Sequence, residues 1–384
     1  MAEERGTSIG AHVAPVTDPR ADRGQDHRLL DIVTVALCAV RCGAAGWVAV
    51  ATCGRAKAAW RRTFLARPGG IPSHDPCGRV VARRDPAEFQ RCFLAWVRAV
   101  VPETAGQVVA RDGTTLRRAH DRANGQAARP LVSAWACGSG LVLGPVAVGD
   151  KSNELVAIPA LLRLLDLEGA TVTLDALGGQ TASAAPIVAQ GADDALALQD
   201  NHPTRHAEVA AEFAAARATA FAAFAPADHD HWATAEQDHG RRETRRDWTI
   251  RAPATSAYLH RGAAWAGRRA SGLGERERRV GETLTRETRY SLLRGGGDAA
   301  AFGRAVRRHW GIEHRVHWVR DVAFREDERR VRAGAGAANL AVLRHFARNL
   351  LRQERATKWS VATKRFRAAL DQDYLLTILA GLHH

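Results

Sequence analysis

The sequence predicts an α/β protein in which a small helical domain precedes a mixed sheet flanked by helices. Three observations predict this class. Apolar residues recur at helical spacing over 29–103, short strand-like segments alternate with helices over 104–200, and helical spacing returns at 299. With 384 residues, 46% of them apolar and 25% charged, the chain is long enough for two or three modules with complete cores.

The charge balance is strongly basic. The chain has 55 Lys and Arg residues against 41 Asp and Glu, which gives a formal charge of +14, and nearly all of the cations are arginines. This composition excludes an acidic disordered chain, a collagen-like repeat and a membrane transporter. It favours nucleic acid as a partner. GC-rich coding would also raise the arginine content, so no single surface arginine identifies a site.

The N-terminal region predicts a tail followed by buried helices. Residues 1–28 are polar and lack periodicity, which indicates a mobile tail, and they contain no apolar segment typical of a secretory signal. The apolar stretch over 32–54 is interrupted by Arg41 and by glycines, so we expect a pair of buried helices rather than a membrane span. Asp85 followed by Pro86 predicts the start of another helix in the 29–103 domain.

The six cysteines form no CxxC motif, and no histidine pair accompanies them at zinc-finger spacing. We therefore expect buried thiols in a reducing cytoplasm and no membrane partner.

Residues 104–200 predict five strands and two helices. The first strand ends at Asp112, the next two are joined by a turn at 138–140, and the fourth ends at Asp175. A helix over 153–167 and another after Gly179 link the last three strands. A three-strand meander followed by helix-linked strands is the order of the ribonuclease-H-like fold.

The second half of the chain is less regular. Residues 201–298 predict an inserted, Arg-rich, mainly β module, with strand-like segments at 241–250 and 282–293. Residues 299–384 return to helix and are expected to complete the core.

Three acidic residues are candidates for a shared metal site. Asp112 and Asp175 end neighbouring predicted strands, so both are expected at one edge of the sheet. Two close carboxylates repel each other unless a cation neutralises them, and Mg²⁺ prefers carboxylate oxygens. Glu313 is the third acid, on a predicted helix whose same face carries His309 and Arg320. Spacing alone leaves other readings open, because the aspartates can be turn or cap residues and Glu313 can belong to a surface ion pair.

Longer motifs carry a resemblance to a known family. They include DHRLLDIVTVAL from residue 26, ARDGTTLRRA at 110–119, the run from DKSNE to LGGQ at 150–180, HWGIEHRVHWVRD from 309 and NLAVLRHFARNLLR at 339–352. In type and order these motifs resemble the DDE-type insertion-sequence transposases of the H-repeat-associated group. The similarity extends from about residue 26 to residue 379.

The resemblance implies a fold and a chemistry. The fold would be a ribonuclease-H-like core with a β-rich insertion before the last acid. The reaction would be Mg²⁺-dependent nicking at transposon ends, followed by attack of the freed 3′-hydroxyl on another phosphodiester. Asp112, Asp175 and Glu313 would be the catalytic acids and would hold two Mg²⁺ ions, for which Mn²⁺ can substitute.

The implied partners are double-stranded DNA with terminal inverted repeats, and target DNA. We expect a homodimer when two ends are paired, in a cytoplasmic, nucleoid-associated protein. Cationic and polar side chains would hold the phosphates. The candidates are Arg117, Arg118, Lys151, Asn153, Arg241, Arg242, Arg245, Arg246, His309 and Arg320.

Several positions depart from the pattern of the group. Thr114 replaces a lysine, the segment LQDNH at 198–202 stands where LKGNQ is usual, and His314 alters the motif after the last acid. The losses leave a second hypothesis open, a catalytically impaired remnant that only binds DNA. If the resemblance is set aside, a third hypothesis is an RNA-processing nuclease of the same fold.

Overall fold

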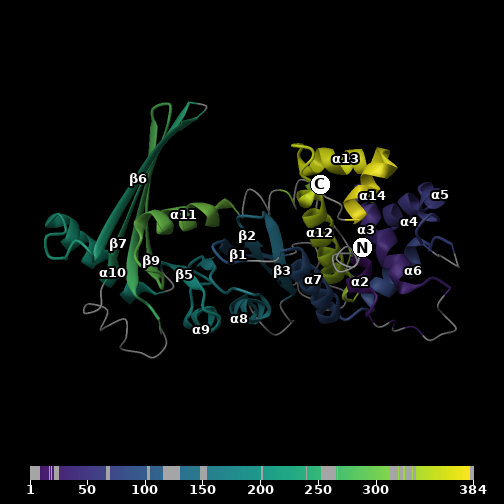
Figure 1. Cartoon of the computed structure of the whole chain (residues 1–384), viewed down its shortest axis with the longest axis horizontal. Coiled ribbons are helices and arrows are strands. Elements are labelled where there is room, and N and C mark those ends of the chain that lie inside the picture. Colours follow the sequence, from purple (N-terminus) through teal and green to yellow (C-terminus); the bar gives the residue numbers. More distant parts are fainter. Residues whose placement is uncertain are drawn as a thin grey trace.

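The computed structural model describes most of the chain (Figure 1). It describes residues 9–16, 18, 20, 26–65, 70–101, 104–115, 130–147, 154–199, 202–238, 240–251, 265, 267–311, 319, 323, 324, 331 and 334–380. For residues 112–115, 130, 131, 145–147, 154 and 380 it describes the backbone alone.

The N-terminal part is helical, as the sequence predicts. Its helices are α2 (Ile9–Val13), α3 (Leu29–Arg41), α4 (Trp47–Ala56), α5 (Ala58–Arg61), α6 (His74–Ala82) and α7 (Pro86–Val100). The apolar stretch expected as a helix pair forms α3 and α4. Asp85 caps α7, since its carboxylate accepts a hydrogen bond from the Ala87 N–H at 3.0 Å, and Pro86 occupies the first turn. In the described part of the chain, no helix is long and apolar enough to cross a membrane.

The segment expected as a mobile tail contains a packed helix. Ile9, Val13 and Val16 are buried in the core, and α2 contacts α3 and α7. These three residues recur at spacings of four and three, which places them on one side of a helical turn. The sequence analysis did not predict this helix, because three apolar residues within a polar segment give only a weak helical periodicity.

A mixed sheet forms the centre of the molecule. Its core strands are β1 (Val108–Thr115), β2 (Pro130–Ala136), β3 (Leu141–Ala147), β4 (Thr171–Leu174) and β5 (Asp193–Leu198), in the order β3-β2-β1-β4-β5. Strand β2 is antiparallel to β1 and β3, while β4 is parallel to β1 and β5. The links α8 (Glu154–Leu164) and α9 (Thr181–Ala189) pack on the sheet. The predicted strands and helices are thus present, but β1 continues past Asp112, which lies inside the strand.

Four long strands continue this sheet. After α10 (Pro203–Ala218) come β6 (His229–Asp238), β7 (Arg241–Arg251), β8 (Ala270–Val280) and β9 (Thr283–Leu293). Strand β9 pairs antiparallel with β5, so the full order of the nine strands is β3-β2-β1-β4-β5-β9-β8-β7-β6. We call β6–β9 the blade, because it projects beyond the core (Figure 1). The β module predicted over 201–298 is therefore hydrogen-bonded to the core sheet.

Two helices cover opposite faces of the blade. Trp232 and Asp247 are cross-strand neighbours, and both lie against Gly303 of α11 (Ala299–His309), where a methyl group would overlap them. Trp248 points to the other face, where the Arg217 guanidinium of α10 lies 4.8 Å from its ring. Because side chains alternate along a strand, each blade residue belongs either to this α11 face or to the α10 face. Helix α11 continues across the sheet to β1 and β4.

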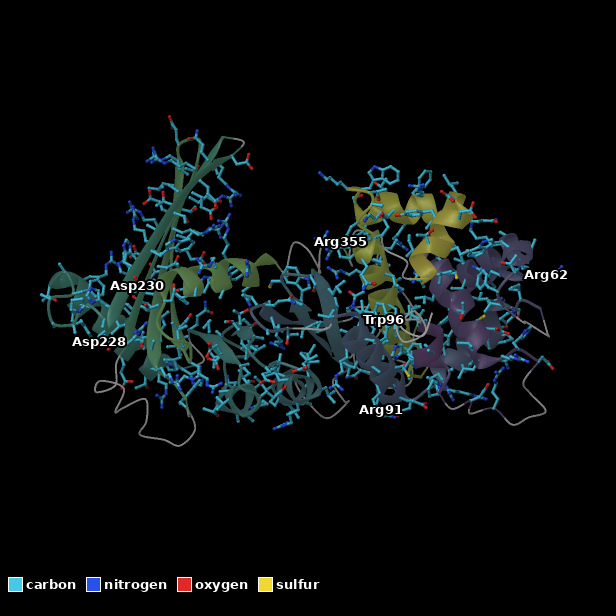
Figure 2. The ribbon with its side chains drawn as sticks, viewed as in Figure 1. Arg62, Arg91, Trp96, Asp228, Asp230 and Arg355 are labelled. Carbon is cyan, nitrogen blue, oxygen red and sulfur yellow. The ribbon has the colours of Figure 1, made fainter. Side chains whose placement is uncertain are left out.

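Asp230 fixes the start of α11 to the blade. Its carboxylate accepts a hydrogen bond from the Ala299 N–H at 2.8 Å, at the base of the blade where Figure 2 labels Asp230.

The chain ends in three helices beside the N-terminal ones (Figure 1). They are α12 (Gly336–Gln353), α13 (Val361–Leu370) and α14 (Gln372–Ala380), and α12 packs on α3, α6 and α7. Trp96, labelled in Figure 2, packs with Phe93 and Phe346 at this joint. The buried Asn349 side chain makes two hydrogen bonds, of 2.9 and 2.7 Å, to the backbone of Val142 and so covers the β3 edge of the sheet.

Candidate active site

Asp112 and Asp175 follow the paired parts of two neighbouring parallel strands by the same number of residues. Ala110 of β1 is level with Thr173 of β4, the last pair in the register. Asp112 follows Ala110 by two residues, and Asp175 follows Thr173 by two. The structure therefore brings these two sequence positions together at one edge of the sheet.

Asp175 is held by a turn and by a buried cation. Its Oδ1 accepts a hydrogen bond from the Gly178 N–H at 2.8 Å, and the Arg111 Nη1 atom lies 3.4 Å from the same oxygen. The Arg111 side chain is fully buried, whereas 39% of the Asp175 side chain is exposed. The carboxylate is thus oriented on one side and open to solvent, so it is available to a metal ion or substrate.

The glycines after Asp175 allow this close approach. A Cβ atom at Gly178 would lie 3.0 Å from both Arg111 Nη1 and Asp175 Oδ1, and one at Gly179 would lie 3.0 Å from the Ala197 carbonyl oxygen. The His202 Nε2 atom is 3.0 Å from the Gly179 carbonyl oxygen. The LQDNH segment, which departs from the family pattern, therefore contacts the Asp175 turn.

Helix α11 ends beside β4. The His309 Nδ1 atom lies 3.0 Å from Thr173 Oγ1, and the Arg289 guanidinium lies 3.9 Å from the Trp310 ring. Burial lowers the pKa of His309 to about 4, although the charge of Asp175 acts in the opposite direction. The imidazole is therefore uncharged at neutral pH and cannot attract phosphate as a cation.

Most of the other predicted site residues lie outside the described part of the chain. They are Arg117, Arg118, Lys151, Asn153, Glu313 and Arg320, together with the side chain of Asp112. Among the residues that are described, no group of three or more His, Cys, Asp or Glu side chains can hold a metal ion. The three-acid metal site remains a prediction.

The four predicted arginines of β7 divide between the two faces of the blade. Arg242 and Arg246 are exposed on the α10 face, whereas Arg241 and Arg245 lie on the α11 face with Glu243 between them. Figure 2 shows nitrogen-bearing side chains along the blade. The run RRETRR is thus two separate surfaces rather than one patch.

Glu243 organises an arginine cluster on the α11 face. Its carboxylate is 2% exposed and pairs with Arg245, with Arg276 of β8 at 2.9 Å and with Arg241 at 3.6 Å. Burial alone would raise the pKa of Glu243, but the Arg276 hydrogen bond and the arginine charges hold it below its usual value. Three guanidiniums around one carboxylate leave a net positive surface. We call these four residues the Glu243 cluster.

Sequence reasoning missed two of these side chains. Arg111 had a usable signal, because it is a charged residue inside the apolar strand VVAR next to a candidate acid. Glu243 had a usable signal as well. Side chains alternate along a strand, so Glu243 lies on the same face as Arg241 and Arg245, while Arg242 and Arg246 lie on the other.

Comparison with known proteins identifies the family. A DDE_Tnp_1-associated domain matches residues 11–97, and the family described as "Transposase DDE domain" matches residues 103–350. The chain is 31% identical to "H repeat-associated putative transposase YhhI" of Escherichia coli K12, over 96% of this chain and 97% of the relative. It is 33% identical to "Putative transposase YncI" of Escherichia coli O157:H7, over 97% of this chain and 95% of the relative.

Among solved structures, the chain resembles a piggyBac transposase synaptic complex with hairpin DNA. The TM-score is 0.40 and the identity is 9%, over 98% of this chain and 79% of the other. The family match covers the whole sheet and reaches into α12, and it agrees with the family that the sequence motifs predicted. The chain therefore belongs to the Transposase DDE domain family.

Proposed function

We propose that this protein is a DNA transposase that cuts the ends of an insertion sequence and joins their 3′-hydroxyls to target DNA. The observation that carries the proposal is that Asp112 and Asp175 each follow the last paired residue of β1 and β4, which are parallel neighbours, by two positions. Family membership supports the same assignment. The core would be ribonuclease-H-like, which the order β3-β2-β1-β4-β5 and the antiparallel β2 support.

Glu313 is the proposed third acid. It follows His309 by four residues, and His309 contacts Thr173, two residues before Asp175. Because four residues span at most about 14 Å, Glu313 would lie within reach of the carboxyl ends of these strands. The blade lies between β5 and α11 in the sequence, so in this proposal it is inserted between the second acid and the third.

The donor set suits Mg²⁺, with Mn²⁺ as a substitute. Asp112, Asp175 and Glu313 offer only carboxylate oxygens, and the half-exposed Asp175 is already oriented by Gly178. When bound, a pair of such ions would stabilise the charge on the attacking and leaving oxygens of a phosphodiester. Arg111 would hold the Asp175 carboxylate in place. His309, uncharged, would offer its Nε2 atom, the ring nitrogen that Thr173 does not contact, as a hydrogen-bonding group near the substrate.

The α11 face of the blade is the proposed DNA surface. It is the face along which α11 runs from the blade toward β4, and it carries the Glu243 cluster. Phosphates bound there would lie on the same side as the helix that leads to Glu313. We expect two copies of the chain to act together, because transposition pairs two ends.

Substitution of the acids tests the proposal. Asp112→Ala and Glu313→Ala should each abolish Mg²⁺-dependent nicking of a duplex carrying the terminal inverted repeats, while binding of that duplex stays measurable. Asp193→Asn is the matched control, because Asp193 is exposed at the opposite end of the sheet, level with Thr171.

Normal cutting by both alanine variants would show that the assignment is wrong. Binding without nicking by the unaltered chain, in Mg²⁺ and in Mn²⁺, would instead identify a DNA-binding remnant.

A further inference from the structure

Helices α4 and α5 present one continuous outward face. Along them exposed residues recur at spacings of four and three, which places these residues in a single stripe on a helical surface. The two helices lie at the end of the molecule opposite the blade (Figure 1), where Figure 2 labels Arg62. The face is therefore separate from the DNA surface proposed on the blade. We call it the α4 stripe, and it consists of Val48, Thr52, Arg55, Ala59 and Arg62.

The opposite side of the same two helices holds this face in place. A Cβ atom at Gly54 would lie 2.7 Å from the Ile71 side chain and 3.3 Å from that of Val35, so α4 packs closely on its neighbours. The Nη1 atom of the fully buried Arg61 donates a hydrogen bond of 3.2 Å to the Cys53 carbonyl oxygen, which ties α5 to the end of α4. The stripe is thus a preformed surface, which lowers the cost of binding a partner.

The segment that carries the stripe has positive charges only. No Asp or Glu occurs from residue 32 to residue 74. In the described part of the chain, neither Arg55 nor Arg62 forms an ion pair with a carboxylate, and the buried Lys57 behind them forms none either. Such a surface attracts a polyanion. The cations of the segment are Arg41, Arg55, Lys57, Arg61, Arg62 and Arg67.

The side chains of the stripe suit the major groove of duplex DNA. A helix with its side chains is about 10–12 Å across, close to the groove width of about 12 Å. Val48 and Ala59 are short and apolar. The Thr52 hydroxyl donates to the Val48 carbonyl oxygen at 2.9 Å, which leaves the methyl group of Thr52 for other contacts. Such groups can contact thymine methyls, whereas Arg55, the long side chain between them, can bind guanine O6 and N7 together.

We propose that the α4 stripe enters the major groove of the terminal inverted repeat and reads its sequence, with Arg55 binding a base and Arg62 a phosphate. This inference rests on the proposed function, because it takes the end of the insertion sequence as the ligand. Arg62 directly follows α5, at the end of the stripe, where a helix leaving the groove meets the sugar–phosphate backbone. Phosphate contacts on the blade carry no sequence information, so the stripe would distinguish the element's own ends from other DNA.

A substitution that keeps the charge tests the base contact. Fluorescence anisotropy in EDTA would compare a duplex carrying the terminal inverted repeat with a scrambled duplex of the same length and composition. Arg55→Lys keeps the charge but loses the planar pair of donors. It should weaken binding of the repeat about tenfold and change binding of the scrambled duplex less than about twofold.

Two further variants test the phosphate contact. Arg62→Gln should weaken binding of both duplexes by the same factor and reduce the slope of log affinity against log salt by about 1. Arg91→Gln is the matched control, because it removes the same charge from an exposed position of α7 on another part of the surface (Figure 2). It should change neither affinity nor slope. Circular dichroism checks that each variant is folded.

The outcomes separate this inference from the proposed function. The α4 stripe is the wrong reader if the unaltered chain does not prefer the repeat, if Arg55→Lys keeps the ratio of the two affinities, or if Arg62→Gln binds as Arg91→Gln does. Because the binding assay contains no divalent metal, its result does not depend on cleavage. A chain that prefers the repeat through Arg55 but never nicks it contradicts the proposed catalysis alone. A chain that nicks the repeat, with a preference that Arg55→Lys retains, contradicts the stripe alone.

Discussion

The Arg111 guanidinium lies 3.4 Å from Asp175 Oδ1, although the two residues are 64 positions apart in the chain. One partner is fully buried on β1 and the other is 39% exposed beyond β4. The pair therefore connects the strand that carries Asp112 with the second candidate acid. A buried cation beside a solvent-facing carboxylate fixes its orientation without closing it to a ligand.

Asp175 should show separable roles in folding and in catalysis. Asp175→Ala removes the oxygen that accepts from the Gly178 N–H and lies beside the buried Arg111 guanidinium, and should lower the free energy of unfolding by about 2 kcal/mol. Asp175→Asn keeps an oxygen for Gly178 and Arg111, so it should cost about 1 kcal/mol or less. Both should abolish nicking if Asp175 binds metal. Urea unfolding together with a nicking assay would measure this, and an active Asp175→Asn variant would contradict the metal role.

The two faces of the blade should differ in DNA binding. Arg245 and Arg276 face each other across β7 and β8 on the α11 face, and Arg242 and Arg279 do the same on the α10 face. Replacing the first pair with glutamine should weaken duplex binding and reduce the slope of log affinity against log salt by about 2, one unit for each lost phosphate contact. The second pair is the matched control and should leave the slope unchanged. Fluorescence anisotropy over a salt series measures both, and equal losses would contradict a one-sided surface.

Glu243 should be the main stabilising charge of the blade. Glu243→Gln removes the buried carboxylate that three neighbouring arginines share and should cost about 3 kcal/mol at pH 7. The pKa of Glu243 is lowered in the folded chain, so its contribution is present above the ordinary pKa of glutamate and is lost as the pH falls through the lowered value. Glu287→Gln, which removes a partly exposed partner of Arg289, should cost less than about 1 kcal/mol. Urea midpoints at pH 7 and pH 3 would test the difference.

Local patterns predicted much of this fold because each depends on neighbouring residues. The capping pair Asp85-Pro86, the turn at 138–140 and the strand ending before Asp175 all follow from short-range geometry. The pairing of β5 with β9 could not be predicted, since it joins segments about a hundred residues apart. Each segment would show the same residue pattern if its strand belonged to a separate sheet. The division of RRETRR between two faces is implicit in strand periodicity, but which face receives α11 depends on tertiary packing.

Two buried groups near α11 should give opposite pH dependences. Burial lowers the pKa of His309 from 6.5 to about 4, so between these values the unfolded chain binds a proton that the folded chain does not. Stability from His309 is therefore lost as the pH falls through this range. Burial raises the pKa of Asp247 from 3.8 to about 6, so the folded chain keeps a proton that the unfolded chain releases, and stability is lost as the pH rises.

Single variants should separate the two effects. Relative to the unaltered chain, His309→Gln should gain stability as the pH is lowered from 7 to 5, by up to about 2 kcal/mol. Asp247→Asn should gain a similar amount as the pH is raised from 4 to 7, because the amide cannot ionise beneath α11. Urea unfolding of both variants at several pH values measures the slopes. Since the two contributions oppose each other in the unaltered chain, a variant slope of the wrong sign would show that the group is hydrated and ionises freely in the folded protein.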